Sequence, residues 1–138
     1  MSTSHVLVDT SMWVEFFSLR PRASAASIAQ LRADILEDRA VIVEPIRAEL
    51  LSGHIRQAQR TTIVRALAAM RSIDLDWTAR EHWNEIIALA TTATKHRLAI
   101  PGVVDRMILL AAQKAGATIC TLDKSLAALA SIASVALR

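Results

Sequence analysis

Short apolar runs alternate along this chain with longer segments of helical periodicity. Three runs are too short for a helix and are typical of buried strands, namely His5–Val8, Ala40–Val43 and Thr118–Leu122. A fourth, Ile73–Trp77, is compatible with a brief strand. Strands that alternate with helices favour a parallel sheet with helices on both of its faces. The alternation therefore predicts an α/β fold.

Turn residues and apolar spacing place the helices between these strands. Pro45 starts one helix at its first turn, and Gly116 closes another just past its last turn. The expected helices are Met12–Phe17, Ala23–Asp38, Ile46–Gly53, Arg56–Met70, Thr78–His96, Val103–Ala115 and Ser125–Ser131. Residues 132–137 are divided between a helix end and an edge strand.

The length of 138 residues fits a single domain, 1–138. A lone cysteine, Cys120, excludes an internal disulfide, and no basic and apolar leader opens the sequence, which together predict a cytoplasmic protein. The longest apolar stretch, Leu126–Leu137, is interrupted by serines and falls short of the roughly 18 to 20 residues that span a bilayer. We therefore expect no membrane segment.

Arginine dominates the positive charge. The net charge of +3 arises from 16 Lys and Arg against 13 Asp and Glu, and 13 of the 16 are Arg. Arginine is the better bidentate phosphate ligand, so an anionic polymer is a natural partner, although many equally basic proteins bind no nucleic acid. With 3 glycines in all, no Gly-rich phosphate loop can be assembled, which disfavours nucleotide-cofactor enzymes.

Four acids fall at the ends of predicted elements or inside apolar helix faces. Asp9 and Asp123 each follow a short apolar run, and such strand ends share one edge of a parallel sheet. Glu49 lies one helical turn after Pro45, and Asp105 opens a helix after Pro101 and Gly102. Each acid alone has an ordinary explanation, because Asp9, Asp105 and Asp123 would serve as helix caps and Glu49 would pair with Arg47 or Arg56.

Together the four acids need a common explanation: pairing with basic residues, shared protons or a divalent cation. Oxygen ligands without histidine or cysteine select Mg²⁺ or Mn²⁺. Such a site would orient a water and offset the charge that develops on a phosphate during hydrolysis. Cys120 and the four histidines lack the spacing of metal ligands, so we expect them to have structural or surface roles. The histidines are His5, His54, His82 and His96. The coincidence of three acids at one predicted edge favours the cation.

Four motifs in order carry a family resemblance: Val8-Asp9-Thr10-Ser11, Glu49-Leu50, Pro101 to Asp105 with the following Arg-Met-Ile-Leu-Leu-Ala-Ala, and Gly116 to Asp123. With them the chain resembles the PIN-domain ribonucleases, specifically the VapC toxins of type II toxin–antitoxin systems. The resemblance spans nearly the whole chain. It implies a PIN-like three-layer sandwich whose central parallel sheet has about five strands.

The resemblance also implies a function and its residues. Asp9, Glu49, Asp105 and Asp123 would hold Mg²⁺ or Mn²⁺ and support endonucleolytic cleavage of RNA. Ser11 would orient Asp9, and Thr121 would do the same for Asp123. The implied partners are RNA, a second copy in a homodimer, and a VapB-type antitoxin whose C-terminal segment lies in the active-site groove of a larger heteromeric complex.

The chain departs from the family pattern at Ser125, where many relatives carry a further acid, and at Leu126, which replaces the usual aromatic residue. We therefore expect a single tightly held ion, with a second one recruited by the substrate phosphate. Arg106 adjoins Asp105 and would reach either a phosphate or a neighbouring carboxylate. Trp13 is expected to pack near the site or near the groove that receives a partner.

Two rival functions follow from the same residues. One is a catalytically silent module that binds RNA or protein through its basic surface and uses the acids only as caps and ion pairs. The other is a nuclease for DNA flaps or RNA maturation, which is disfavoured because the short chain has no added binding region.

Overall fold

The computed structural model describes residues 4–53 and 55–138, and His54 lies outside this part. The described residues form a four-stranded sheet in the order β3-β2-β1-β4. The strands are β1 Val6–Val8, β2 Ala40–Ile42, β3 Arg71–Ser72 and β4 Thr118–Cys120. Every neighbouring pair is parallel, which confirms the predicted α/β fold with a parallel sheet.

The C-terminal residues contribute a partial fifth strand. Leu137 forms an isolated parallel bridge with Ile119 of β4. The N–H of Ile119 donates to the carbonyl of Ala136, and the N–H of Arg138 donates to the carbonyl of Ile119, both at 2.9 Å. The expected count of about five strands is thus met by four strands and one bridge in the described part of the chain.

The third strand lies earlier in the chain than predicted. β3 pairs Arg71 and Ser72 with β2, whereas the apolar run suggested Ile73–Trp77. Beyond Ile73 the chain leaves the sheet because the Asp74 carboxylate accepts from the backbone N–H of Glu44 at 2.9 Å and from Trp77 Nε1 at 2.8 Å. Asp74 therefore satisfies the N-terminus of the helix that begins at Glu44, earlier in the chain, and ends the strand.

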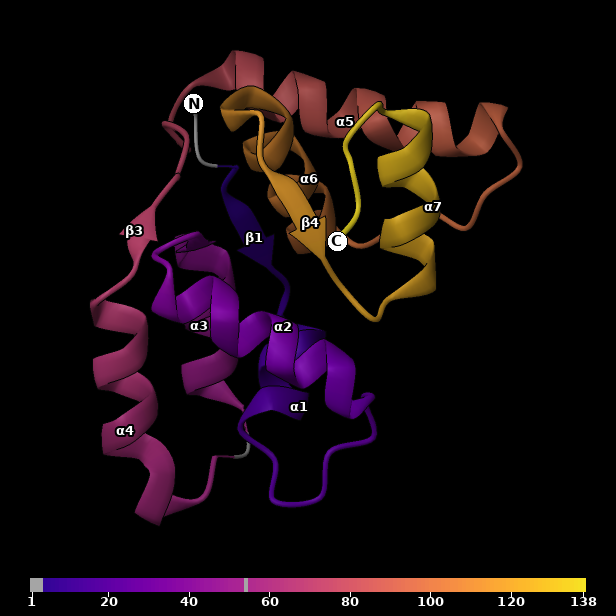
Figure 1. Cartoon of the computed structure of the whole chain (residues 1–138). Helices are drawn as coiled ribbons and strands as arrows, with labels where there is room; N and C mark the ends of the chain where they lie inside the picture. The colour runs from indigo at the N-terminus through magenta and orange to yellow at the C-terminus, as the bar shows by residue number, and fades with distance from the viewer. Residues whose placement is uncertain (1–3, 54) are drawn as a thin grey trace.

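Helices flank the sheet in two groups, as Figure 1 shows. One group consists of α1 Thr10–Phe16, α2 Ala25–Leu36, α3 Glu44–Ser52 and α4 Gln57–Ala68. The other consists of α5 Arg80–Lys95, α6 Val103–Ala115 and α7 Lys124–Ile132. All lie within a few residues of the predicted positions. None of the described helices has the length and apolar content that a bilayer-spanning helix needs.

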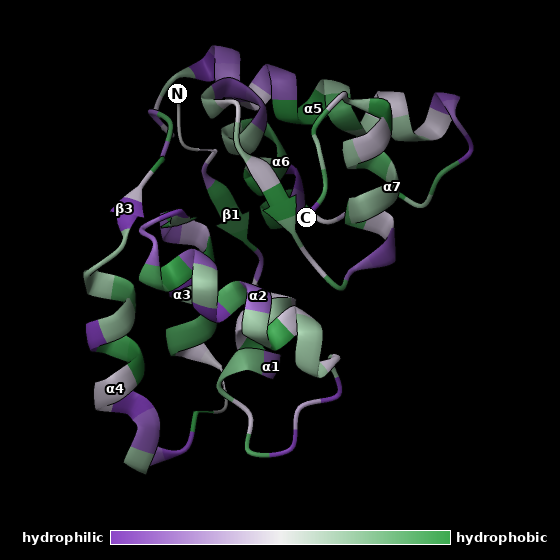
Figure 2. Ribbon diagram, viewed as in Figure 1, coloured by the Kyte–Doolittle hydropathy of each residue, from purple (hydrophilic) through white to green (hydrophobic). Residues whose placement is uncertain are grey.

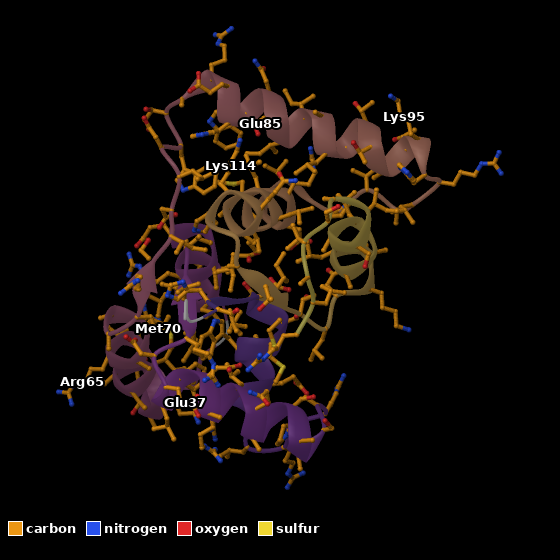
Figure 3. The ribbon with its side chains drawn as sticks, turned by 45° about the horizontal axis from the view of Figure 1, so that its top comes forward. Glu37, Arg65, Met70, Glu85, Lys95 and Lys114 are labelled. Atoms are coloured by element: carbon orange, nitrogen blue, oxygen red, sulfur yellow. The ribbon has the colours of Figure 1, made fainter. Side chains whose placement is uncertain are left out.

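The core lies around the short strands. Figure 2 shows β1, the end of β4 and much of α6 as hydrophobic ribbon. Leu7 and Ile119 of the sheet and Ile108 of α6 are fully buried. The outer side of this layer is charged: Lys114 of α6 pairs with Glu85 of α5 at 2.9 Å, and both are labelled in Figure 3.

A buried carboxylate anchors the C-terminal residues to α2. Asp34 is 1% exposed and accepts from the guanidinium groups of Arg39 and Arg138. The two arginines compensate the charge that burial would otherwise penalise. This anchor and the Leu137 bridge hold the end of the chain beside β4, next to the carboxyl edge of the sheet.

Candidate metal centre

Asp9 occupies the carboxyl end of β1, the central strand of the described sheet. Its side chain is almost fully buried, and its backbone N–H donates to the carbonyl of Cys120 at 2.9 Å, which ties the ends of β1 and β4 together. Oδ1 accepts from the N–H of Thr10 at 2.7 Å, so Asp9 does cap α1. Oδ2 accepts from Ser11 Oγ at 2.9 Å and from Thr121 Oγ1 at 2.7 Å. Three donors thus fix the orientation of this carboxylate.

Thr121 contacts a different carboxylate from the one the sequence suggested. It was predicted to orient Asp123, but its hydroxyl donates to Asp9 and accepts from the backbone N–H of Asp123 at 3.0 Å. Ser11 has a matching link, because its Oγ accepts from the N–H of Leu122 at 3.0 Å. The two hydroxyls therefore join the strand ends that carry Asp9 and Asp123.

Asp123 caps α7. Its Oδ1 accepts from the hydroxyl of Ser125 at 2.7 Å and from the backbone N–H groups of Ser125 and Leu126 at 2.9 and 3.1 Å. The Ser125 hydroxyl and then the Leu126 N–H hold the pKa of Asp123 below its ordinary value. None of the hydrogen bonds of the described residues uses Oδ2, so one oxygen of an ionised carboxylate stays available.

Glu49 and Asp105 reach the same edge from two helices. Glu49 is exposed on α3, and its Oε1 accepts from Thr10 Oγ1 at 2.7 Å. The carboxyl of Asp105, in the first turn of α6, has its pKa raised to about 6 by burial and by the charges of Asp9, Asp123 and Glu49. The four acids predicted from the sequence therefore form one electrostatic cluster.

The cluster fits a divalent cation in charge and in donor chemistry. No ion pair within residues 4–53 and 55–138 includes any of the four acids. Within the same ranges, no three His, Cys, Asp or Glu side chains already stand at ligating positions. Hard oxygen donors with uncompensated charge suit Mg²⁺. Side-chain rotation, for which exposed Glu49 has room, would be needed to close them around an ion.

Thr10 is a site residue that sequence reasoning missed. Its backbone N–H donates to Asp9 and its hydroxyl donates to Glu49, so one residue contacts two of the four acids. The available signal was its place between Asp9 and Ser11 in the N-terminal motif.

Two further predicted contact residues, Arg106 and Trp13, make contacts within the fold. Arg106 donates through Nε to the carbonyl of Pro101 at 3.0 Å and through Nη1 to that of Ile86 at 2.9 Å, which ties the start of α6 to α5. None of its described hydrogen bonds goes to a carboxylate. Trp13 is 0% exposed and stacks on Phe17, so its ring packs inside the fold beside α1, and its expected place near a partner groove stays a prediction. Its place four residues after Asp9 in the motif concealed that α1 turns this ring into the core.

The raised pKa of Asp105 gives a pH dependence for the metal-free protein. In the folded chain the Asp105 carboxyl retains a proton that the unfolded chain releases above pH 3.8. The free energy of unfolding therefore falls as pH rises from 3.8 to about 6. Asp105→Asn should therefore match the parent near pH 4 and be more stable at pH 7, by about 1 kcal/mol after screening of this half-exposed group. Thermal unfolding without metal measures this. Equal stability of both proteins at pH 7 would show that neither burial nor repulsion by the other acids raises the pKa of Asp105.

A family model for the PIN domain matches residues 6–132. A VapC ribonuclease of Mycobacterium bovis is 32% identical over 71 residues, which cover 51% of this chain and 52% of that protein. Ribonuclease VapC11 of Mycobacterium tuberculosis has the same identity over the same length. The match thus spans about half the length of these curated relatives.

Solved structures share the fold over nearly the whole chain. The structure of FitAcB from Neisseria gonorrhoeae has a TM-score of 0.66 at 19% identity and covers 96% of this chain and 95% of that chain. VapBC2 from Rickettsia felis, bound to a DNA fragment from its promoter, has a TM-score of 0.65 at 15% identity and covers 96% of each chain. A toxin–antitoxin complex from Klebsiella pneumoniae has a TM-score of 0.64 at 21% identity, and the match covers 88% of this chain and 90% of that chain.

Proposed function

Because the chain belongs to the PIN domain family, we propose that it is a Mg²⁺-dependent endoribonuclease that hydrolyses RNA phosphodiester bonds with water as the nucleophile. One observation carries the proposal: four carboxylates from β1, α3, α6 and the β4–α7 junction converge without a cationic partner among the described residues, and their mutual repulsion contributes to the raised pKa of Asp105. A protein that used these acids only as caps would have no reason to gather them. An ion that offsets their charge supplies the reason.

The residues divide into those that would hold the ion and those that support them. Asp9, Glu49, Asp105 and Asp123 would hold Mg²⁺, and Mn²⁺ would substitute for it. When bound, the ion would orient a water and offset the charge on the scissile phosphate.

Ser11 and Thr121 hold Asp9 Oδ2 in place, and Thr10 holds Glu49. At the position where an additional acid would add a ligand, Ser125 instead donates its hydroxyl to Asp123. The site is therefore suited to one tightly held ion.

We further propose that this nuclease is a toxin neutralised by a VapB-type antitoxin in the cytoplasm, where RNA is available. The VapC names of the sequence relatives and the toxin–antitoxin complexes among the structural neighbours support this assignment. The active form would be a homodimer, and a larger heteromeric complex would form with the antitoxin.

The chemistry of the cleaved ends tests the proposed reaction. Attack by water on the phosphorus breaks one P–O ester bond and leaves a phosphomonoester on one fragment and a hydroxyl on the other. Incubation of the purified chain with RNA and Mg²⁺ should therefore yield fragments without 2′,3′-cyclic phosphate, as mass spectrometry of the products would show. Cyclic ends would indicate attack by the RNA 2′-hydroxyl and contradict the mechanism. No cleavage of any RNA would support the silent binding module.

A further inference from the structure

A cavity of about 480 Å³ lies where the end of α1 faces α3 and α4, and we call it the α1–α4 cavity. Its lining begins at Thr10, whose hydroxyl donates to Glu49. The cavity therefore shares one residue, Thr10, with the surroundings of the carboxylate cluster. A phosphodiester held at that cluster would have its neighbouring nucleotide within reach of this cavity.

The walls of the cavity are largely apolar and include an aromatic ring. Phe17 lines it, and the same ring stacks on buried Trp13 with centroids 5.7 Å apart and an interplanar angle of 17°. Val14 and Leu19 also line it, and they are 53% and 73% exposed. Unpaired bases stack on such aromatic and apolar surfaces. The packing of Phe17 on Trp13 makes the ring a firm wall for a base.

Arginine supplies the charge among the described residues that line the cavity. They include Arg20 and Arg56, and none of them is Asp or Glu. Neither arginine takes part in an ion pair within the described ranges of the chain. Guanidinium groups beside an apolar cavity match the alternation of phosphate and base along an RNA strand.

Gln59 adds a group that can read a base edge. Its Nε2 donates to the carbonyl of Phe17 at 3.2 Å, which fixes the side chain against the aromatic wall. No hydrogen bond within the described part of the chain uses its Oε1. A carboxamide oxygen accepts from an exocyclic amino group, which adenine, cytosine and guanine carry and uracil does not.

We propose that the α1–α4 cavity binds the unpaired RNA base next to the scissile phosphate, with Gln59 as a specificity-determining residue that favours a base bearing an amino group. Phe17 and Leu19 supply the walls, and Arg20 and Arg56 bind the flanking phosphates. The inference rests on the proposed RNA substrate. The link from the cavity to Glu49 through Thr10 favours RNA, because a strand whose phosphate lies at the carboxylates must place its next nucleotide beside them.

Binding without catalysis tests the inference. Fluorescence anisotropy in EDTA would measure the affinity of labelled single-stranded oligoadenylate and oligouridylate. The parent should bind oligoadenylate more tightly, and Gln59→Leu should remove most of this preference.

Arg56→Gln should weaken the binding of both RNAs about fivefold. It should also lower the slope of log affinity against log salt concentration by about 0.7. Leu19→Ala should weaken the binding of both RNAs by a similar factor. The matched control is Arg65→Gln on α4, the helix that Arg56 precedes, because Arg65 extends away from α4 in Figure 3 and is not among the described residues that line the cavity. The affinity of Arg65→Gln for both RNAs should stay within about twofold of that of the parent.

The outcomes separate this inference from the proposed function. If Arg56→Gln and Leu19→Ala bind RNA as the parent does, the cavity is not a base site and a protein segment is its better occupant. An unchanged base preference in Gln59→Leu would overturn the role of that residue. If the parent binds RNA with the expected dependences but cleaves none in Mg²⁺, the inference stands and the nuclease proposal fails.

Discussion

Asp9→Asn should abolish RNA cleavage and leave the fold intact. Both oxygens of Asp9 are positioned by Thr10, Ser11 and Thr121, so the loss of its charge removes the best-oriented ligand of the proposed centre. Loss of a residue that merely supports a metal ligand costs about 10- to 100-fold in activity or affinity, and loss of this ligand should cost more than about 100-fold. The rate of cleavage under single-turnover conditions in Mg²⁺ measures the effect.

Asp38→Asn is the matched control for this substitution. Asp38 is an exposed acid with a φ of 59°, a backbone conformation that asparagine also accepts, so the control removes one charge without strain. It should cleave at the parent rate. Circular dichroism should show equal helix content in both variants. Cleavage by folded Asp9→Asn within about threefold of the parent would remove Asp9 from the centre.

Divalent metal should stabilise the parent chain and fail to stabilise Asp105→Asn. An ion that binds only the folded protein adds about 2.7 kcal/mol at 100 times its Kd, which corresponds to a rise in Tm of about 5 to 10 °C. In Asp105→Asn the burial of a charge and the repulsion by the other three acids, which together raise the pKa of Asp105, are both relieved, and a ligand charge is lost. Thermal unfolding with and without Mn²⁺ measures both proteins.

The two effects of this substitution have opposite signs and check one another. Asp105→Asn should unfold at a higher temperature than the parent without metal and at a lower one in saturating Mn²⁺. Glu44→Gln serves as the control, because Glu44 also lies close to the end of a strand but forms an ion pair with Arg47 at 2.9 Å. The Tm of Glu44→Gln should rise in Mn²⁺ by as much as the Tm of the parent. An equal Mn²⁺ shift in Asp105→Asn and the parent would place the ion elsewhere.

The sequence was sufficient for the fold class and for the identity of the clustered acids. Apolar runs of strand length between helical segments admit few arrangements, and the carboxyl ends of parallel strands must share an edge. Asp9 and Asp123 could therefore be neighbours once the strands before them were recognised. The strands pair directly, and Val8 lies opposite Cys120.

Contacts made by side chains across the edge were not predictable in the same way. Thr121 lies two residues before Asp123 and still bonds Asp9, because the choice depends on how closely β1 and β4 approach. The full burial of Trp13 was not predictable either, because α1 is short and its direction decides which of its faces is buried. The strand near Ile73 was misplaced because Asp74 caps a helix that is distant in sequence.

Calorimetric titration of Mn²⁺ into the metal-free chain tests the central claim most directly, because it asks whether the four carboxylates form one cation site. We expect one saturable site in the parent and in Glu44→Gln, weakened more than about tenfold by Asp105→Asn or Glu49→Gln. A parent that binds no Mn²⁺, or variants that bind it as tightly as the parent, would contradict the account.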